Sequence, residues 1–193
     1  MDNKELELKI GVIGKQGVGK STITMRFIDE RFIEDYDPIL IDEYRKKKDF
    51  NDKKIILSIL DTASSEETIY NIRSWAKYCD SFVLVYSIDD KNTFNEILTY
   101  DQIIQNVKSK NYPKVLIGNK NDLFTKRVVK TKEGKELAKH LNCKYIETSA
   151  KNGENIKQLF YESALVLLEN EDYLKRKEKE KEKEKKKGGC LLM

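Results

Sequence analysis

The sequence predicts an α/β fold: a doubly wound, six-stranded sheet that is mostly parallel, with one antiparallel edge strand and helices on both faces. Two observations support this fold class. Short β-branched and apolar runs alternate with longer amphipathic stretches over residues 1–174, and glycine-rich or polar motifs directly follow several of these runs. A chain of 193 residues is long enough for one domain with its own core and a short extension.

Apolar periodicity predicts the elements in turn. Strands are expected at 6–13, 55–60, 81–86, 114–118 and 144–148, and helices at 20–29, 66–78, 93–109, 132–141 and 156–177. The polar segment 44–50 leads into an Asn-Asp pair and then a buried run, which is typical of an edge strand that turns back on its neighbour. Ligands of such sheets bind at the carboxyl ends of the strands.

Charge is distributed unevenly along the chain. The 37 Lys and Arg exceed the 33 Asp and Glu, for a net charge of +4. Residues 175–187 hold nine basic and four acidic side chains, which leaves 28 basic and 29 acidic residues before them. The near-neutral domain gives little support for nucleic-acid binding, and residues 175–189 are expected to form a basic, disordered tail.

Composition also limits the membrane and metal chemistry. No apolar run approaches the roughly 18 residues of a membrane span, and no apolar leader precedes the first strand, so neither a span nor a secretion signal is expected. Three distant cysteines, one of them Cys190, argue against a disulfide framework and fit a reducing compartment. Cys79 and Cys143 are expected to be buried, Trp75 to pack a helix, and His140 to be a solvated helix residue.

A phosphate-binding motif follows the first predicted strand. GxxxxGK[ST] is matched by Gly14, Lys15, Gln16, Gly17, Val18, Gly19, Lys20 and Ser21. The glycines let successive backbone N–H groups point at a phosphate, the helix start adds positive potential, and Lys20 supplies a point charge. The Ser21 hydroxyl is expected to coordinate Mg²⁺. The alternative is a glycine-rich turn without a ligand.

A second motif follows the strand at 114–118 and selects the base. It reads Asn119, Lys120, Asn121 and Asp122. The carboxylate can accept both N–H groups on the edge of guanine, a pair that adenine does not offer, and such complementarity discriminates by about 10⁴. A surface turn is the alternative for this motif alone. The same carboxylate disfavours an ATP-using P-loop kinase or transporter subunit.

Two further segments complete the set. The last strand runs into Glu147, Thr148, Ser149, Ala150 and Lys151, which would place a backbone N–H near guanine O6. Asp61, which precedes Thr62 and Ala63, is expected to hold Mg²⁺ through water, with capping of a helix start at Thr62 as the alternative.

Together these motifs, in this order, resemble a Ras-family small GTPase over essentially the whole chain. The resemblance implies a P-loop G-domain over residues 1–174, binding of GTP and GDP with Mg²⁺, and recognition by exchange factors, GTPase-activating proteins and effectors. It also implies that Phe32 packs against the base. The first switch and effector region would comprise Tyr36, Asp37, Pro38, Ile39, Leu40, Ile41, Asp42, Glu43 and Tyr44.

The sequence departs from the family around the γ-phosphate. Ile39 stands where the family has a Thr that binds Mg²⁺ and the γ-phosphate, and Ser64-Ser65 stands where it has Gly-Gln. Of the two catalytic positions, Lys20 is retained, whereas Ser65 is too short to orient the attacking water. Gln16 replaces a glycine and would crowd both the water and an incoming arginine finger. Slow hydrolysis is therefore predicted, with water positioning by Gln16 itself as the alternative.

The first switch carries two opposing expectations. Slow hydrolysis favours a GTP-bound protein, whereas loss of the Thr oxygen weakens closure of this segment. Residues 39–41 form an apolar run, either a partner surface or a segment that folds back on the domain. The second function considered is therefore an interaction module that holds nucleotide without hydrolysing it.

The end of the sequence predicts a lipid anchor. Cys190-Leu191-Leu192-Met193 fits CaaX, and the final Met suggests farnesylation of Cys190, unless the cysteine stands there by chance. One lipid gives weak attachment, so the basic tail is expected to add affinity for an anionic membrane surface. The cytoplasmic face of the plasma membrane is the expected location.

Overall fold

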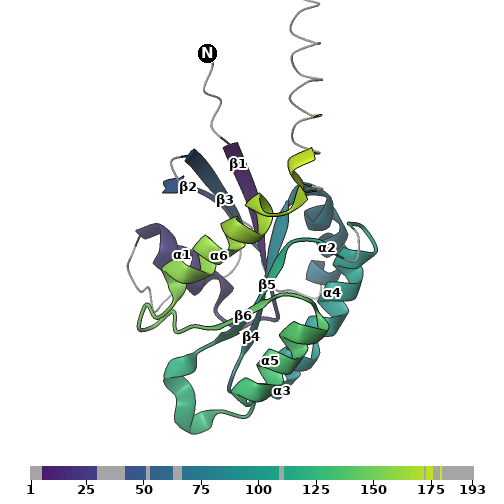
Figure 1. Ribbon diagram of the computed structural model, residues 1–193. Coiled ribbons are helices and arrows are strands. Elements are labelled where there is room, and N and C mark those ends of the chain that lie inside the picture. Colours follow the sequence, from purple (N-terminus) through teal and green to yellow (C-terminus); the bar gives the residue numbers. More distant parts are fainter. Residues whose placement is uncertain are drawn as a thin grey trace, which may run out of the picture.

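The computed structural model describes residues 6–29, 42–50, 53–62, 67–108, 111–171, 173–175 and 179 (Figure 1). Its strands are β1 (Leu6–Ile13), β2 (Asp42–Phe50), β3 (Lys53–Asp61), β4 (Ser81–Ser87), β5 (Lys114–Asn119) and β6 (Lys144–Glu147). Its helices are α1 (Lys20–Asp29), α2 (Glu67–Tyr78), α3 (Lys91–Asn95), α4 (Ile97–Gln105), α5 (Thr131–His140), α6 (Ile156–Leu168) and the 3₁₀ helix η1 (Asn121–Lys126).

The six strands form one sheet in the order β2-β3-β1-β4-β5-β6. β2 pairs antiparallel with β3, and every other neighbouring pair is parallel. This confirms the predicted mixed sheet with its antiparallel edge strand. The carboxyl ends of β1, β3, β4 and β5 therefore meet at one edge, where the motifs follow them.

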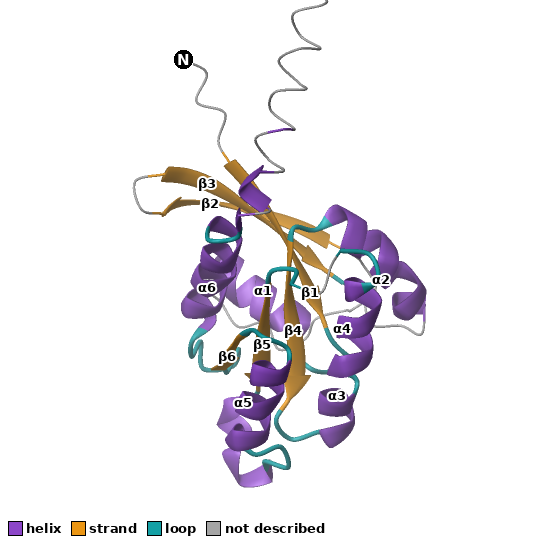
Figure 2. Cartoon of the chain, turned by 45° about the vertical axis from the view of Figure 1, so that its right-hand side comes forward, coloured by secondary structure: helices purple, strands orange, loops and turns teal. Residues whose placement is uncertain are grey.

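Two apolar cores lie on opposite faces of the sheet (Figure 2). Side chains of β4 alternate between them: Val83 and Val85 face α1 and α6, whereas Phe82, Leu84 and Tyr86 face the core shared with α2, α4 and α5. All seven residues of β4 are buried, as expected for a strand covered on both sides. The doubly wound arrangement is thus confirmed.

Two predicted helices differ from the structure. The single helix expected at 93–109 is two short helices, with the boundary at Glu96, where the backbone stays helical (φ −72°, ψ −17°). The helix expected at 156–177 ends at Leu168. The helix does not continue unbroken beyond this point. The side chain of Asn170 accepts a hydrogen bond from the N–H of Tyr173 (2.8 Å), which is the bond that an N-cap residue makes at the start of a new helical turn.

Several single-residue predictions are confirmed. Trp75 is 7% exposed, Cys79 is fully buried, and His140 is exposed at the end of α5. Burial raises the pKa of the Cys79 thiol to about 12, so this cysteine is inert at neutral pH. Cys143 is only partly buried.

Within the described part of the chain, no helix is long and apolar enough to span a bilayer.

A buried ion pair joins α4 to the start of β5. Lys114 Nζ lies 2.5 Å from Asp101 Oδ1, and both side chains are 3% exposed. The Tyr112 hydroxyl donates to the same carboxylate oxygen (2.7 Å), and Gln105 donates to the other. Burial and the neighbouring carboxylate raise the pKa of Tyr112 well above its usual value. This cluster satisfies a charge that would otherwise be costly inside the protein.

Removing one charge from this pair should destabilise the domain. We expect Asp101→Asn to lower the free energy of unfolding by about 3–5 kcal/mol, because it leaves the Lys114 ammonium buried without a counter-ion. Urea denaturation of the GDP-loaded protein measures the change. Glu136→Gln removes a carboxylate from the exposed pair with Lys132 and should leave the stability nearly unchanged. If Asp101→Asn and Glu136→Gln had the same free energy of unfolding, the buried ion pair between Asp101 and Lys114 would not contribute to stability as expected.

Candidate functional site

The loop between β1 and α1 has the backbone that the phosphate motif requires. Gly17 and Gly19 adopt φ values of 81° and 92°, in the left-handed region that side chains rarely tolerate. Gly14 lies so close to β4 that an added Cβ would be 2.2 Å from the carbonyl oxygen of Val85. The backbone of this loop therefore requires glycine at these three positions.

Lys20 lies inside this loop, where a phosphate needs its charge. Its side chain is buried, and Nζ donates to the carbonyl oxygens of Gly14 (2.9 Å) and Lys15 (3.3 Å). Burial lowers the pKa of the ammonium to about 8, although the carboxylate of Asp61 opposes the shift. A bound phosphate would favour the charged form, so the loop is chemically suited to an anion.

The proposed Mg²⁺ donors lie on adjacent elements. Ser21 is the second residue of α1, and Asp61 ends β3, which pairs with β1 so that Asp61 lies opposite Val12. The Thr62 hydroxyl donates to the Val12 carbonyl (2.7 Å) and fixes this junction. Asp61 is 1% exposed at the end of β3, and residues 63–66, which bear on the helix-cap alternative, lie outside the described part of the chain.

These donors fit the expected cation. A serine hydroxyl and a carboxylate are hard oxygen ligands, and Mg²⁺ in nucleotide sites usually takes one or two protein oxygens together with phosphates and waters. Among the residues that the structure describes, no group of three or more His, Cys, Asp or Glu side chains could hold a metal without further ligands. When bound, the ion would neutralise phosphate charge.

Asn119 connects the phosphate loop to the base-binding segments. It is 1% exposed at the end of β5. Its Nδ2 donates to the Val18 carbonyl (2.8 Å), and its Oδ1 accepts from the Thr148 hydroxyl (3.0 Å) and, at 3.4 Å, from the Ala150 N–H. Asn119 itself is therefore not a surface-turn residue. One buried amide holds three segments together.

Asp122 and the loop after β6 form the other side of the base site. The Ser149 hydroxyl donates to Asp122 Oδ1 (2.5 Å) and accepts from the N–H of Asn152 (3.1 Å). Lys120, between the two motif residues, has φ 66°, which turns the chain so that Asn119 is buried and Asp122 becomes the second residue of η1. A carboxylate has acceptor sites for more than one hydrogen bond, so Asp122 can still accept from guanine.

Arg127 is a residue of this region that the sequence analysis missed. Its guanidinium forms two parallel hydrogen bonds with Glu147 (2.8 and 2.9 Å) and a third with Asn121 Oδ1 (2.8 Å). Burial would raise the pKa of Glu147, but hydrogen bonds from Arg127, Tyr145 and Thr131 outweigh it and hold the pKa below its usual value. The pair clamps η1 against β6, which fixes the spacing of the two base-binding segments.

A second missed contact supports the phosphate loop. Lys15 Nζ lies 2.5 Å from Glu96 Oε1, and the Tyr100 hydroxyl donates to the other carboxylate oxygen (2.6 Å). The side chain of Lys15 thus reaches α4, and only its backbone belongs to the phosphate loop. Gln16 is exposed, as is Lys151 on the far side of the site. No local pattern points to this pair, because its members are 81 residues apart in the chain.

Several predicted residues lie outside the described part of the chain. They are Phe32, Tyr36, Asp37, Pro38, Ile39, Leu40, Ile41, Ala63, Ser64, Ser65 and Cys190. Of the predicted effector region, Asp42, Glu43 and Tyr44 lie on β2. Glu43 accepts hydrogen bonds from the hydroxyls of Ser58 and Tyr78, and these bonds lower the pKa of its carboxyl.

Comparison with known proteins agrees with this geometry. The Ras family model matches residues 9–169. Ras-like protein 1 of Saccharomyces cerevisiae is 44% identical over 167 residues, which cover 86% of this chain and 53% of that protein. Ras-like protein rasV of Dictyostelium discoideum is 40% identical over 88% of this chain and 75% of its own length.

A third relative, the Ras-related and estrogen-regulated growth inhibitor of Homo sapiens, is 42% identical over 82% of this chain and 80% of its own length. The chain thus spans about half of the yeast relative and three quarters or more of the other two. The family match includes the phosphate loop, Asp61 and both base-binding segments. The chain belongs to the Ras family of small GTPases.

Proposed function

We propose that this protein binds GTP and GDP with Mg²⁺ and acts as a membrane-anchored signalling switch whose GTP hydrolysis is slow. The observation that carries the nucleotide assignment is Asn119, a buried amide that joins the phosphate loop at Val18 to the base-binding loop at Thr148. A ligand that carries both phosphate and base would bind across this connection. Asp122 at the rim of that site favours guanine.

Slow hydrolysis is supported by the chemistry of four positions. Ile39 lacks the Thr oxygen that binds Mg²⁺ and the γ-phosphate in the family, and Ser65 lacks the amide that orients water. Ser64 stands where the family has the glycine whose N–H contacts the γ-phosphate, and Gln16 adds bulk to an exposed position of the phosphate loop. In Ras itself, the type case for this reaction, an activating partner's arginine contributes about 10³–10⁵ in rate. This chain should forfeit most of that factor. The same positions also favour the second candidate function, an interaction module that holds nucleotide without hydrolysing GTP.

Single-turnover hydrolysis tests the proposal. Purified protein is loaded with GTP and Mg²⁺, and phosphate release is followed with and without a Ras-type GTPase-activating protein. We expect a slow rate that the activator barely changes, and chromatography of the bound nucleotide should show mainly GTP. A family-typical response to the activator would contradict slow hydrolysis. No measurable hydrolysis at all would favour the interaction module, whereas adenine nucleotide in the protein would refute both.

Membrane attachment is a separate part of the proposal. Its support is the CaaX sequence at Cys190 and the excess of positive charge in residues 175–187. The unaltered protein is expected at the cytoplasmic face of the plasma membrane. Cys190→Ser should move it from the membrane fraction to the soluble fraction of lysed cells. High salt should release the intact protein partly, because the tail contributes by electrostatics. A variant that still sediments with membranes would refute the lipid anchor.

A further inference from the structure

Two tyrosine hydroxyls meet between the sheet and α5, beside the base-binding segments. Tyr86 of β4 is fully buried, and its hydroxyl lies 2.8 Å from the hydroxyl of Tyr145 on β6. The two strands are not neighbours, because β5 lies between them. Tyr86, Gly118 and Glu147 form one row across β4, β5 and β6. Because Gly118 has no side chain, the Tyr86 hydroxyl can reach across β5.

Two glycines leave the space that the hydroxyl pair occupies. A Cβ added at Gly118 would lie 2.8 Å from the Tyr86 oxygen and 2.9 Å from the Tyr145 oxygen, and one added at Gly134 of α5 would lie 2.5 Å from each. Neither glycine has a positive φ, so the backbone does not require glycine at either position. Gly134 lies inside a helix, where alanine is the better helix former. Space for the two hydroxyls accounts for both glycines.

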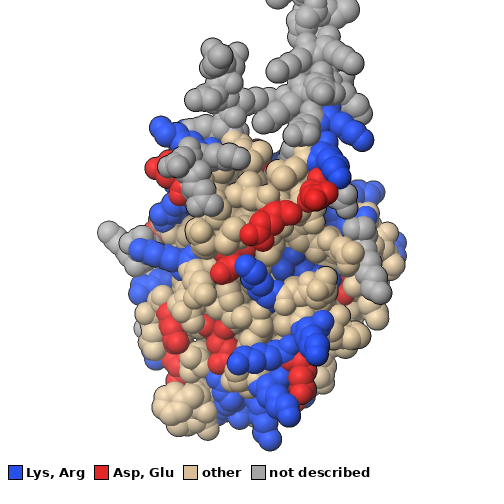
Figure 3. Space-filling view, viewed as in Figure 1, with Lys and Arg blue, Asp and Glu red and all other residues tan. Residues whose placement is uncertain are grey.

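Helix α5 covers the hydroxyl pair. Gly134 is buried on its inner side, whereas its exposed lysines are Lys132, Lys135 and Lys139. Figure 3 shows basic side chains gathered over the region where Figure 1 draws this helix. Since Tyr86 is fully buried, its hydroxyl depends on a protein partner, and a buried hydroxyl that loses its partner is costly.

The Glu147 carboxylate fixes the direction of these hydrogen bonds. The Tyr145 hydroxyl lies 2.8 Å from Glu147 Oε1. Although burial raises the pKa of Glu147, hydrogen bonds from Arg127, Tyr145 and Thr131 hold that pKa below its usual value. The carboxylate is therefore ionised at neutral pH and only accepts. Tyr145 donates to Glu147, so Tyr86 donates to Tyr145, and hydroxyls aligned in this way polarise one another.

Glu147 connects the tyrosine pair to both base-binding segments. It ends β6 and is the first residue of the segment 147–151. Its carboxylate binds Arg127, whose guanidinium donates to Asn121 Oδ1 (2.8 Å). The N–H of Asn121 donates to the carbonyl oxygen of Thr148 (2.9 Å), and Asp122 is the next residue in the chain. A continuous series of hydrogen bonds thus joins the tyrosine pair to the neighbour of the guanine-reading carboxylate.

We propose that the Tyr86–Tyr145 hydroxyl pair is a positioning device for the guanine site, which holds Glu147 and, through Arg127, the segment before Asp122, and so slows the release of guanine nucleotide. Both tyrosines act through Glu147 and neither contacts the ligand. This role rests on the proposed binding of GDP and GTP. The phosphate loop takes no part in the series, so the pair should affect recognition of the base and not that of the diphosphate.

Nucleotide release from the full-length protein tests this role. Tyr145→Phe keeps the ring but removes the bonds to Tyr86 and Glu147. We expect it to speed GDP release by about tenfold and to lower the preference for GDP over ADP by a similar factor, with ADP affinity unchanged. Release of a fluorescent GDP analogue measures the rate, and calorimetric competition with Mg²⁺ measures the preference. If both stay as in the unaltered protein, the positioning role is refuted.

A double-mutant cycle tests whether the two hydroxyls act in series. Tyr86→Phe should speed GDP release by only about threefold, because Tyr145 keeps its bond to Glu147. The double variant should release GDP no faster than Tyr145→Phe alone, since Tyr86 acts only through Tyr145. Additive effects of the two substitutions would mean that Tyr86 acts by another route, and the proposed series would be wrong.

Tyr112→Phe separates positioning from stability. It also removes a buried hydroxyl that donates to a carboxylate, that of Asp101 (2.7 Å), but this bond takes no part in the series. The variant should be less stable in urea and should keep the full preference for GDP over ADP. If it loses this preference as Tyr145→Phe does, general loosening of the domain explains the effect, and the positioning role is wrong.

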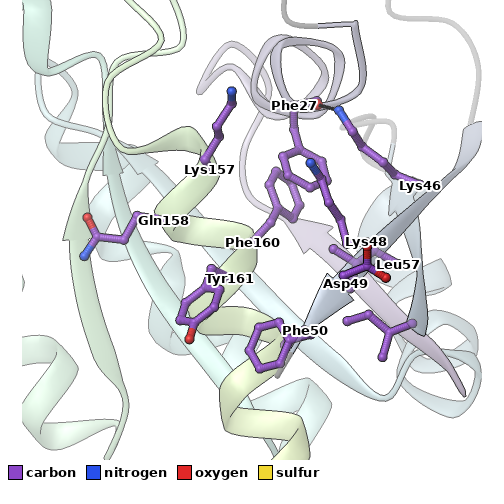
Figure 4. A pocket seen from close by; sticks show the side chains of 12 residues that line it. Phe27, Lys46, Lys48, Asp49, Phe50, Leu57, Lys157, Gln158, Phe160 and Tyr161 are labelled. Carbon is purple, nitrogen blue, oxygen red and sulfur yellow. Dashed lines mark hydrogen bonds between the residues drawn. The ribbon is translucent and has the colours of Figure 1, made fainter. Parts of the chain in front are cut away.

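Tyr161→Phe is a control on the opposite face of the sheet. Tyr161 is 47% exposed and lines a cavity of about 430 Å³ between α1, α6 and the β2–β3 hairpin (Figure 4). Stacked aromatic rings form the walls of this cavity, and three lysines line its end near Phe27. The variant should change neither stability nor GDP release. Faster GDP release in Tyr161→Phe, equal to that in Tyr145→Phe, would contradict the assigned role.

Failure of this role and failure of the proposed function give different results. If the unaltered protein does not prefer GDP over ADP, the nucleotide assignment is wrong, and the positioning role falls with it. If the unaltered protein prefers GDP, and Asp122→Ala loses this preference while Tyr145→Phe keeps it together with slow release, only the positioning role is wrong. Loss of the preference in both variants, with Tyr112→Phe unaffected, would support it.

Discussion

Asp122→Ala is expected to lower the affinity for GDP by about 10⁴-fold and to abolish the preference for GDP over ADP. The carboxylate is held in place by the Ser149 hydroxyl at 2.5 Å, at the start of η1. Removing it leaves the two N–H groups on the edge of guanine without an acceptor inside the site. The phosphate loop is untouched, so the residual affinity should be that of a diphosphate and should not depend on the base.

Calorimetric competition between GDP and ADP in the presence of Mg²⁺ measures this effect. Asp29→Ala, an exposed carboxylate at the end of α1, is the matched control and should bind GDP as the unaltered protein does. The circular dichroism of both variants establishes that they are folded. If Asp122→Ala still prefers GDP over ADP, base recognition does not depend on this carboxylate, and the assignment of the site is wrong.

Restoring the family residues at four positions should restore the response to a GTPase-activating protein. We expect the combination of Gln16→Gly, Ile39→Thr, Ser64→Gly and Ser65→Gln to raise the activator-stimulated rate by about 10³-fold or more, within the range that Ras itself shows as the type case. The restored groups supply the Thr oxygen, the water-orienting amide and the space for an incoming arginine. Single-turnover phosphate release measures the rate.

The contribution of Gln16 is isolated by a variant that carries only the other three substitutions. Because Gln16 occupies an exposed position of the loop, this variant should respond much less to the activator than the fourfold variant. GDP affinity should be similar in all of these proteins, since none of the changes touches Asn119 or Asp122. If the fourfold variant hydrolyses GTP no faster than the unaltered protein, these positions do not explain slow turnover.

The parts of the fold that depend on local sequence were predictable. β1 and α1 have the predicted bounds, because an apolar run followed by a glycine-rich loop and an amphipathic stretch specifies a strand, a turn and a helix over consecutive residues. The breaks at Glu96 and Asn170 were missed because apolar periodicity continues across them. Side-chain bonds interrupt the helix at Asn170, and hydrophobic spacing carries no information about such bonds.

The nucleotide site shows the same division. The sequence by itself predicted which residues should meet the ligand, since Gly19, Lys20, Asn119 and Asp122 belong to short motifs whose chemistry is local and whose place at strand ends follows from the fold class. It did not reveal the Arg127–Glu147 clamp, whose members are 20 residues apart and meet only because η1 packs against β6.

Only the tertiary structure decided where charges are buried and where a cavity opens. Asp101 and Lys114 form an ion pair, and three lysines line one end of an aromatic cavity, because the register of β2 with β3 and the packing of α1 and α6 bring separate segments together. The physical reason is one of range. Backbone conformation and motif chemistry are set within a few residues, whereas burial and charge pairing depend on neighbours that are distant in sequence.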